Sequence, residues 1–184
     1  MTQLSRWSRR GAIGAAALLA AGLAATSCSS GGAVAGAPRA EPYTLEGHKF
    51  VVAFPSRPSV EPNPPAFSPA NGLPAGTAAT GLGVGQLGST SQPHSFEVIV
   101  AVLPTSSSTN LVAAWFRALA EGLKPERIDG HLGVRHISAV QQGSARYFGG
   151  FELVESGRTF YALGAYDSSR AAVSGFLESF SIRS

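Results

Sequence analysis

Alternating and continuous runs of bulky apolar residues mark the strands that the chain should form. In residues 50–54, bulky apolar side chains alternate with smaller or polar ones, and a period of two residues is that of a strand. Residues 95–104 are apolar on both faces and rich in β-branched side chains, which predicts a central strand. Further strands are expected at residues 134–140, 147–154, 159–166 and 181–183. The Glu-Ser-Gly-Arg sequence at 155–158 predicts a hairpin turn.

Two segments repeat apolar residues at spacings of three and four, the period of an amphipathic helix. The first comes after several N-cap candidates at 106–110, and its apolar positions are Leu111, Val112, Trp115, Phe116, Leu119 and Leu123. The second has Asp167 or Ser168 as its cap, and its apolar positions are Ala172, Val173, Phe176, Leu177 and Phe180. A polar turn is expected at 126–130. The order of elements predicts an α+β domain, with a central, largely antiparallel sheet flanked by two helices.

Residues 56–92 differ sharply in composition from the chain around them. They contain six prolines and six glycines but only two charged residues, Arg57 and Glu61. Such a stretch inside a domain is normally a functional loop or a disordered insertion. We expect a mobile Pro/Gly-rich insertion in preference to a lid. The Gly-x-Gly-x-x-Gly match at residues 83–88 does not predict a dinucleotide site, because it lies outside a strand-to-helix context.

The first residues have the layout of an export signal. Arg9 and Arg10 belong to a positively charged start, and residues 12–25 form an Ala/Leu-rich segment that ends in small residues. This segment is shorter than the roughly 20 apolar residues that a membrane-spanning helix needs. Residues 1–27 are therefore expected to be a signal peptide. The paired arginines resemble a twin-arginine motif, and export by that route or by the general secretory route stays open.

The chain contains a single cysteine, Cys28, at the end of this apolar segment. Small residues before such a cysteine resemble a bacterial lipobox, in which the sulfur receives a diacylglyceryl group and the cysteine becomes the mature N-terminus. Residues 28–42 would then form a lipid anchor and a flexible Ser/Gly/Ala-rich tether. The fatty chains would provide stable attachment to a membrane. We expect a palmitate-bearing lipoprotein on the extracytoplasmic face of the cell membrane, while an ordinary secreted protein is the alternative.

The charge balance argues against nucleic acid as a partner. The chain has 14 Lys and Arg against 11 Asp and Glu, a net charge of +3. Three of the cationic residues and none of the acids precede Cys28, so the chain from Cys28 onward carries 11 of each sign. Nucleic-acid binding would need a clustered excess of cationic residues. Residues 43–184, beyond the tether, are expected to be one domain that is held together without a disulfide.

Three segments carry a resemblance to a known group of proteins. Residues 47–55 near the start, together with residues 157–163 and 176–182 near the end, resemble small bacterial secreted or lipid-anchored domains with the PsbP-like α/β/α sandwich fold. That group includes the LpqN-type envelope lipoproteins of mycobacteria. The resemblance extends over Tyr43–Ile182, interrupted by residues 56–92. It implies a non-catalytic binding or accessory role at the cell envelope, and it supplies no catalytic residues.

The sequence contains no catalytic or metal-binding pattern. The four histidines are His48, His94, His131 and His136. The last two are five residues apart, a spacing that suits neither one face of a helix nor one face of a strand. No Gly-x-Ser-x-Gly elbow and no phosphate-binding loop occurs. No metal, cofactor or catalytic residue is therefore predicted, and the ligand-binding residues stay unknown.

Aromatic residues crowd the last part of the chain. They are Tyr147, Phe148, Phe151, Phe160, Tyr161, Tyr166, Phe176 and Phe180. Neighbours in a strand point to opposite faces, so these rings either fill a core on both faces of the sheet or border an apolar groove. Most are expected in the core. Gly149 and Gly150 within one strand indicate a bulge or the close approach of another backbone.

These observations lead to three hypotheses of function. The first is a non-catalytic cell-envelope lipoprotein that binds an apolar small molecule, a lipid or an envelope protein. The second is an envelope hydrolase or transferase with a dispersed active site, which would bring a histidine within hydrogen-bond reach of a serine or an acid. The third is an assembly subunit that displays an exposed sheet edge.

Overall fold

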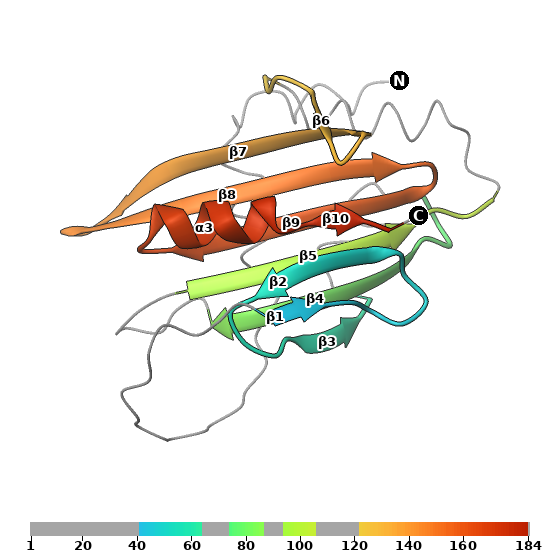
Figure 1. Ribbon diagram of the computed structural model, residues 1–184, viewed down its shortest axis with the longest axis horizontal. Coiled ribbons are helices and arrows are strands. Elements are labelled where there is room, and N and C mark those ends of the chain that lie inside the picture. Colours follow the sequence, from blue (N-terminus) through green and yellow to red (C-terminus); the bar gives the residue numbers. More distant parts are fainter. Residues whose placement is uncertain (1–40, 64–73, 87–93, 106–121, 184) are drawn as a thin grey trace.

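A seven-stranded antiparallel sheet forms the frame of the protein (Figure 1). The computed structural model describes residues 41–63, 74–86, 94–105 and 122–183. The strands lie in the order β3-β4-β5-β9-β8-β7-β6, and every neighbouring pair is antiparallel. Their bounds are Ser59–Pro62 (β3), Ala78–Gln86 (β4), His94–Val102 (β5), Glu126–Ile128 (β6), His131–Gln142 (β7), Ala145–Ser156 (β8) and Thr159–Asp167 (β9).

One face of this sheet is covered by a helix and a small second sheet. The helix is α3 (Arg170–Glu178), which packs on β8 and β9. The second sheet has the order β1-β2-β10, with β1 at Glu41–Tyr43, β2 at Phe50–Phe54 and β10 at Ser181–Ile182. Figure 1 shows α3, β10 and β2 in front of the large sheet. Two segments that are far apart in sequence, residues 41–54 and 170–182, thus close the same face.

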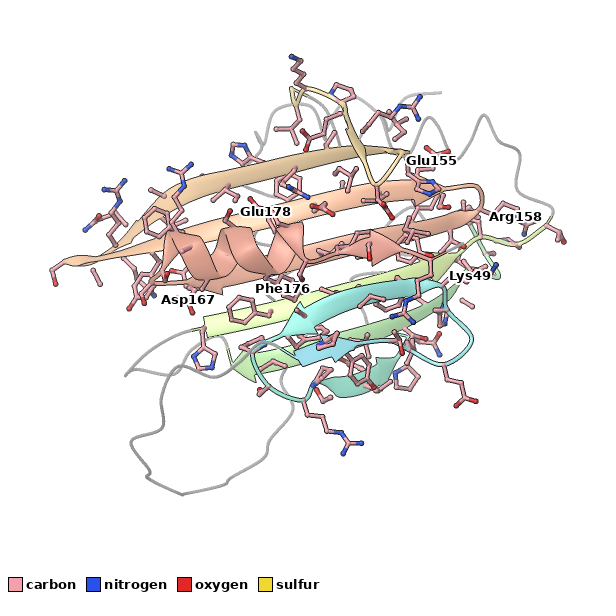
Figure 2. All side chains as sticks on the ribbon, viewed as in Figure 1. Lys49, Glu155, Arg158, Asp167, Phe176 and Glu178 are labelled. Atoms are coloured by element: carbon pink, nitrogen blue, oxygen red, sulfur yellow. The ribbon has the colours of Figure 1, made fainter. Side chains whose placement is uncertain are left out.

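The space between the helix and the large sheet is a filled core. Phe50 lies 5.7 Å from Tyr161 between ring centroids, and Phe176 lies 5.2 Å from both Phe54 and Phe96. Figure 2 shows Phe176 between α3 and β5. The buried members of this cluster include Val52, Val98, Val100, Val154, Leu163, Val173, Leu177 and Phe180. The core alternative is therefore confirmed for these rings on this face.

The opposite face of the large sheet carries a second buried cluster. Its members are Ala79, Ile99, Ala101, Leu103, Val134, Phe151, Leu153, Phe160 and Ala162, with Leu123 packed against them. In β5, successive side chains belong alternately to the two clusters, because neighbours in a strand point to opposite faces. This confirms the prediction that residues 95–104 contain a central strand with two apolar faces.

Gly150 lets α3 approach the sheet closely. A Cβ atom on Gly150 would lie 2.6 Å from Val173 Cγ1 and 3.0 Å from Leu177 Cδ1, so any larger residue would push the helix away. At Gly149 the nearest atoms would be 3.6 Å and 3.8 Å away, which is ordinary contact. Gly150, and not Gly149, therefore marks a close approach, which is one of the two interpretations that the sequence allows.

The start of α3 differs by one or two residues from the predicted caps. Ser169 is the N-cap, and its hydroxyl accepts a hydrogen bond from the N–H of Ala172 at 3.3 Å. Asp167 precedes this cap by two residues, and its Oδ1 accepts a hydrogen bond from the N–H of Ser169 at 2.6 Å. At the other end, the Ser179 hydroxyl donates to the carbonyl of Phe176 and accepts from the N–H of Ala53. The end of the helix and β2 are thus joined.

The prediction of an α+β sheet flanked by two helices is wrong. The described residues are mostly strand, in two antiparallel sheets, with α3 as the one helix that the structure describes. The other predicted helix, over residues 111–123, lies for the most part outside the described residues. Periodicity also missed strands that are short or rich in glycine, so the predicted share of strand was too low.

The prediction that residues 56–92 lack regular structure is also wrong for the part described. β3 and β4 both lie in this stretch, and β4 pairs along its whole length with β5. In β4, Gly81 and Gly83 alternate with the apolar Leu82 and Val84, which is a strand pattern with one face made of glycine. The glycine-rich composition therefore did not indicate this strand. Because glycine has no side chain, the strand leaves space on one face of the sheet.

The expected polar turn at 126–130 contains a hairpin instead. β6 pairs with the start of β7, and Asp129 and Gly130 form the turn with φ values of 49° and 81°. An Asp-Gly pair is a favourable sequence for such a turn, and this signal was present in the sequence. The Asp129 carboxylate also accepts from the N–H of Ile182 at 2.6 Å, which ties β10 to this turn.

Candidate functional site

The export and anchor residues predicted from the sequence lie outside the described residues. This applies to Arg9, Arg10 and Cys28, and their roles stay predictions. None of the helices that the structure describes is both long and apolar enough to cross a membrane.

The histidines do not come together in a metal site within the described ranges. His131 pairs with Ile128 at the β6–β7 turn, whereas His136 lies further along β7 with its ring 5.9 Å from that of Phe151. In the same ranges, no group of three or more His, Cys, Asp or Glu side chains could hold a metal ion. His136 and Phe151 are cross-strand neighbours, so their contact is a consequence of sheet register.

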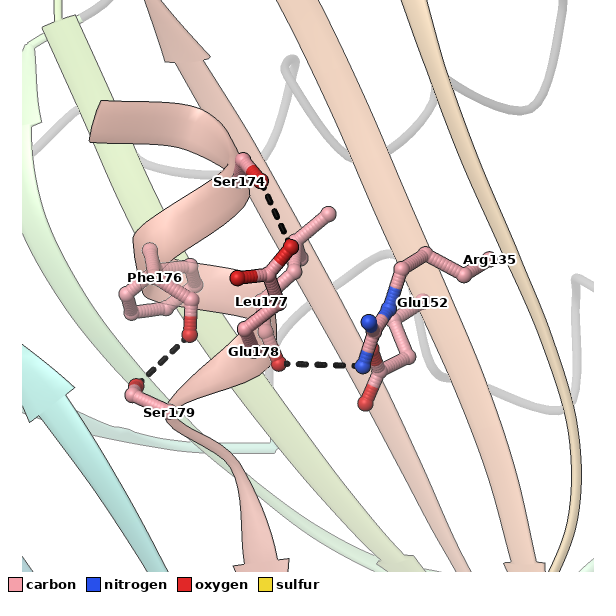
Figure 3. Close-up of polar contacts among 7 residues, drawn as sticks. All are labelled: Arg135, Glu152, Ser174, Phe176, Leu177, Glu178 and Ser179. Carbon is pink, nitrogen blue, oxygen red and sulfur yellow. Dashed lines mark hydrogen bonds and ion pairs between the residues drawn. The ribbon is translucent and has the colours of Figure 1, made fainter. Parts of the chain in front are cut away.

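A partly buried ion pair joins β7, β8 and α3 (Figure 3). Arg135 Nε donates to Glu152 Oε2 at 2.5 Å, and the Glu152 side chain is 0% exposed. Arg135 Nη2 also lies 3.5 Å from the carbonyl oxygen of Leu177, in the last turn of α3. A cation at the carbonyl end of a helix is electrostatically favourable. The pair therefore holds the helix end against the sheet.

Burial dominates the electrostatics of Glu152 despite its partner. Removal of water from the carboxyl raises the pKa of Glu152 to about 7, and Arg135 only partly opposes this effect. The second carboxyl oxygen, Oε1, is buried without a hydrogen-bond partner among the described residues. Because Arg135 is held by both Glu152 and the helix end, we interpret the pair as a structural clamp.

On the opposite face, Glu97 is a second buried carboxyl. It is 6% exposed, and its cross-strand neighbours Gly83 and Gly164 carry no side chains. Its Oε1 occupies the space beside Gly164, 2.8 Å from where a Cβ atom would be. Burial, with a smaller contribution from Glu61, raises the pKa of Glu97 to about 8. Glu97 is therefore mostly protonated at neutral pH and adds no negative charge to this face.

The far end of the β7–β8 hairpin presents the clearest surface for a partner. We call it the hairpin surface and define it by Val140, Gln142, Arg146, Tyr147, Phe148 and Tyr166. In Figure 1 the β7–β8 turn projects at the left, beyond α3. All six residues are exposed or half-buried, and Phe148 also packs against the edge of the core beneath α3.

Tyr147 and Tyr166 are stacked on this surface. Their ring centroids are 5.3 Å apart with an interplanar angle of 19°. The Tyr166 hydroxyl donates to Gln142 Oε1 at 3.4 Å, and burial together with the nearby Tyr147 raises the pKa of Tyr166. Val140, beside them and 38% exposed, adds an apolar side chain that remains accessible. Val140 and Tyr166 both lie beside Gly149, where a Cβ atom would be in ordinary contact with each of them.

The other side of the hairpin carries a cation and a ring. The Arg146 guanidinium lies 5.3 Å from the centroid of the Phe148 ring, within the range of a cation–π contact. Tyrosine and arginine are among the residues that most often dominate binding at protein interfaces, because each combines a large apolar body with a polar group. This arrangement combines apolar, aromatic and cationic groups that are suited to binding.

Only part of this surface could be predicted from the sequence. The crowding of aromatic residues was visible, but which of them meet depends on register. Tyr147 and Tyr166 lie 19 positions apart in the sequence. Phe148 in β8 pairs with Asp167 in β9, and this register brings the preceding residues, Tyr147 and Tyr166, together. Pairing the two strands residue by residue outward from the Glu-Ser-Gly-Arg turn would have predicted this contact.

The comparisons with known proteins are sparse. No protein-family model matches the sequence. No curated protein matches it. Among solved structures, the chain is similar to the solution structure of the cyanobacterial PsbP (CyanoP) from Synechocystis, with a TM-score of 0.43 and 10% identity over 84% of this chain and 98% of that chain. Because the TM-score and the identity are low, nothing about fold or function is inferred from it.

Proposed function

We propose that the protein is a non-catalytic lipoprotein of the bacterial cell envelope whose folded domain binds another protein. In this proposal, fatty chains on Cys28 attach the mature chain to the outer side of the cell membrane, and residues 29–40 act as a tether; the predicted tether is two residues too long, because Glu41 and Pro42 belong to β1. Attachment would restrict the domain to the neighbourhood of the membrane, where it meets its partner.

The filled core beneath α3 favours a protein partner over a small apolar ligand in that position. Aromatic side chains from β2, β5, β9 and α3 occupy the space between the helix and the large sheet. At Gly150 the helix is already so close that a single added methyl group would meet it. A ligand between these layers would have to displace well-packed side chains, which is costly.

The observation that carries the proposal is the stacked Tyr147–Tyr166 pair beside the accessible Val140. These side chains are held in place by strands, so little side-chain entropy is lost when a partner covers them. Large, rigid aromatic groups next to an exposed apolar residue form the kind of cluster that anchors protein interfaces.

Site-specific photo-crosslinking tests the proposal. A photoreactive amino acid at Val140, in the full chain expressed in a bacterial host, should give a covalent adduct with a defined envelope protein. The matched control carries the same amino acid at Ser56, which is exposed and lies just after β2. No protein adduct at position 140, or the same adducts from both positions, would contradict the proposal. An adduct with lipid alone would favour the apolar-ligand hypothesis instead.

The anchor has its own test. Wild-type protein should label with a radioactive fatty acid and remain with membranes, whereas Cys28→Ala should lose both the label and the membrane attachment. Unchanged mass and membrane association in Cys28→Ala would contradict this part of the proposal.

A further inference from the structure

Within the described part of the chain, the outer edge of β7 is open over most of its length. β6 pairs only with the first residues of β7, as far as Gly133. From Val134 to Gln142 no described strand lies on the outer side of β7, although its inner side pairs with β8 throughout. The side chains from Ser138 to Gln142 are all exposed. An unpaired strand edge presents a row of backbone N–H and C=O groups that another strand can satisfy.

This edge lacks the features that normally block strand addition. Residues 137–142, Ile-Ser-Ala-Val-Gln-Gln, contain no charge and no proline. The opposite edge of the sheet is different, because β3 has only four residues, contains Glu61 and Pro62, and comes after Pro58. Proline and charge are the usual protection of exposed edges. Among the described strands, one edge of the large sheet is therefore protected and the other is available.

We infer that β7 pairs with β7 of a second copy of this chain, so that two large sheets join into one continuous antiparallel sheet. The inference rests on the proposed function, since it names the partner that would cover the hairpin region. A two-fold axis perpendicular to the sheet makes the two contacts identical, which is the commonest symmetry of protein dimers.

Self-pairing is compatible with the charges along β7. Pairing centred on Ser138 places Arg135 of each copy opposite the neutral Gln141 of the other, and Ile137 opposite Ala139. No like charges then face each other. Arg135 moreover binds Glu152 and lies near the carbonyl oxygen of Leu177 within its own copy, so its guanidinium is already engaged there. The same register keeps each face of one sheet continuous with the same face of the other.

Sedimentation velocity over a wide range of protein concentration tests the inference. The sample is the full chain with Cys28→Ala, which removes the predicted acylation site and hence any association through lipid. This protein should show a monomer–dimer equilibrium. Adding Ser138→Lys places two ammonium groups opposite each other and should weaken dimerisation about tenfold or more. Ser56→Lys adds the same charge at an exposed site away from β7 and should leave the dimer unchanged.

Disulfide trapping provides a second measurement that does not depend on Ser138→Lys folding well. With Cys28→Ala the chain has no other cysteine, so Ser138→Cys should form a covalent dimer on mild oxidation and Ser56→Cys should not. A dimer insensitive to Ser138→Lys would overturn the inference. A monomer that still crosslinks from position 140 to a different protein would overturn the inference and leave the proposed function standing. A monomer without any protein adduct would overturn both.

Discussion

Glu97 should make the stability of the protein depend on pH in a direction opposite to that of most carboxylates. Its pKa is raised from 4.5 to about 8 by burial in the sheet face, with a contribution from Glu61. Well below pH 4.5 the carboxyl is protonated in both the folded and the unfolded chain, so the difference in pKa between the two states has no effect on stability. Between pH 4.5 and about pH 8 the unfolded chain ionises first, and the folded state loses stability relative to it.

The size of the effect is set by the shift in pKa. Each unit of difference in pKa corresponds to about 1.4 kcal/mol. Relative to low pH, the free energy of unfolding therefore falls by about 3 kcal/mol at pH 7 and by about 5 kcal/mol above pH 8 because of Glu97. Glu152 is shifted in the same direction, with a pKa of about 7. It is present in wild type and in any Glu97 variant, so its contribution cancels when the two are compared.

Glu97→Gln is the change that tests this reasoning. The amide has nearly the same shape and cannot ionise, so any constant penalty for burying it is the same at every pH. The free energy of unfolding of Glu97→Gln minus that of wild type should be flat below pH 4.5, rise by about 1.4 kcal/mol per unit up to pH 8, and then level off. Guanidinium unfolding followed by circular dichroism measures this difference.

The control is Glu46→Gln, which removes an acid from an exposed position. A curve for this variant that rises as steeply as that of Glu97→Gln would show that the effect is not specific to the buried carboxyl. If the Glu97→Gln curve is flat, or falls as pH rises, the carboxyl is ionised in the folded protein and the assigned protonation of this sheet face is wrong.

Three further changes test the packing and the anchor. Gly150→Ala should destabilise the fold by about 1–3 kcal/mol because its methyl group meets α3, whereas Gly149→Ala should change the unfolding free energy by less than about 1 kcal/mol; equal effects would refute the close approach. Arg135→Met should lower stability by about 3 kcal/mol by leaving Glu152 buried without its partner, and adding Glu152→Leu should recover most of the loss; no recovery would contradict the clamp. Cys28→Ala should lower the mass of the mature protein by that of its acyl groups, as mass spectrometry would show.

Several elements could be predicted because their signals are local. The strand at Phe50–Phe54 alternates cleanly, and the hairpin between β8 and β9 turns at Gly157, whose φ of 63° suits glycine. The helix near the C-terminus showed an apolar stripe that packs as expected on the sheet. These features depend on residues within a few positions of one another, so periodicity and turn chemistry suffice to find them.

Other features depended on residues that are distant in sequence. β4 could not be distinguished from a glycine-rich loop until its pairing with β5 was known, because glycine-rich strands carry little hydrophobic signal. The raised pKa of Glu97 arises from burial beside Gly164, a residue 67 positions away. That β7 forms an open edge among the described strands was visible only once β6 proved to pair no further than Gly133.

Local patterns in the amino-acid chain were thus enough to specify the apolar faces of the main strands, the hairpin turn, the last helix and the balance of charge after Cys28. The tertiary structure decided the strand order, the filling of the space beneath α3, the burial of Glu97 and Glu152, and the assembly of the hairpin surface. The physical reason is that periodicity records which side of an element avoids water, whereas partners and burial are set by contacts between elements whose register no local pattern specifies.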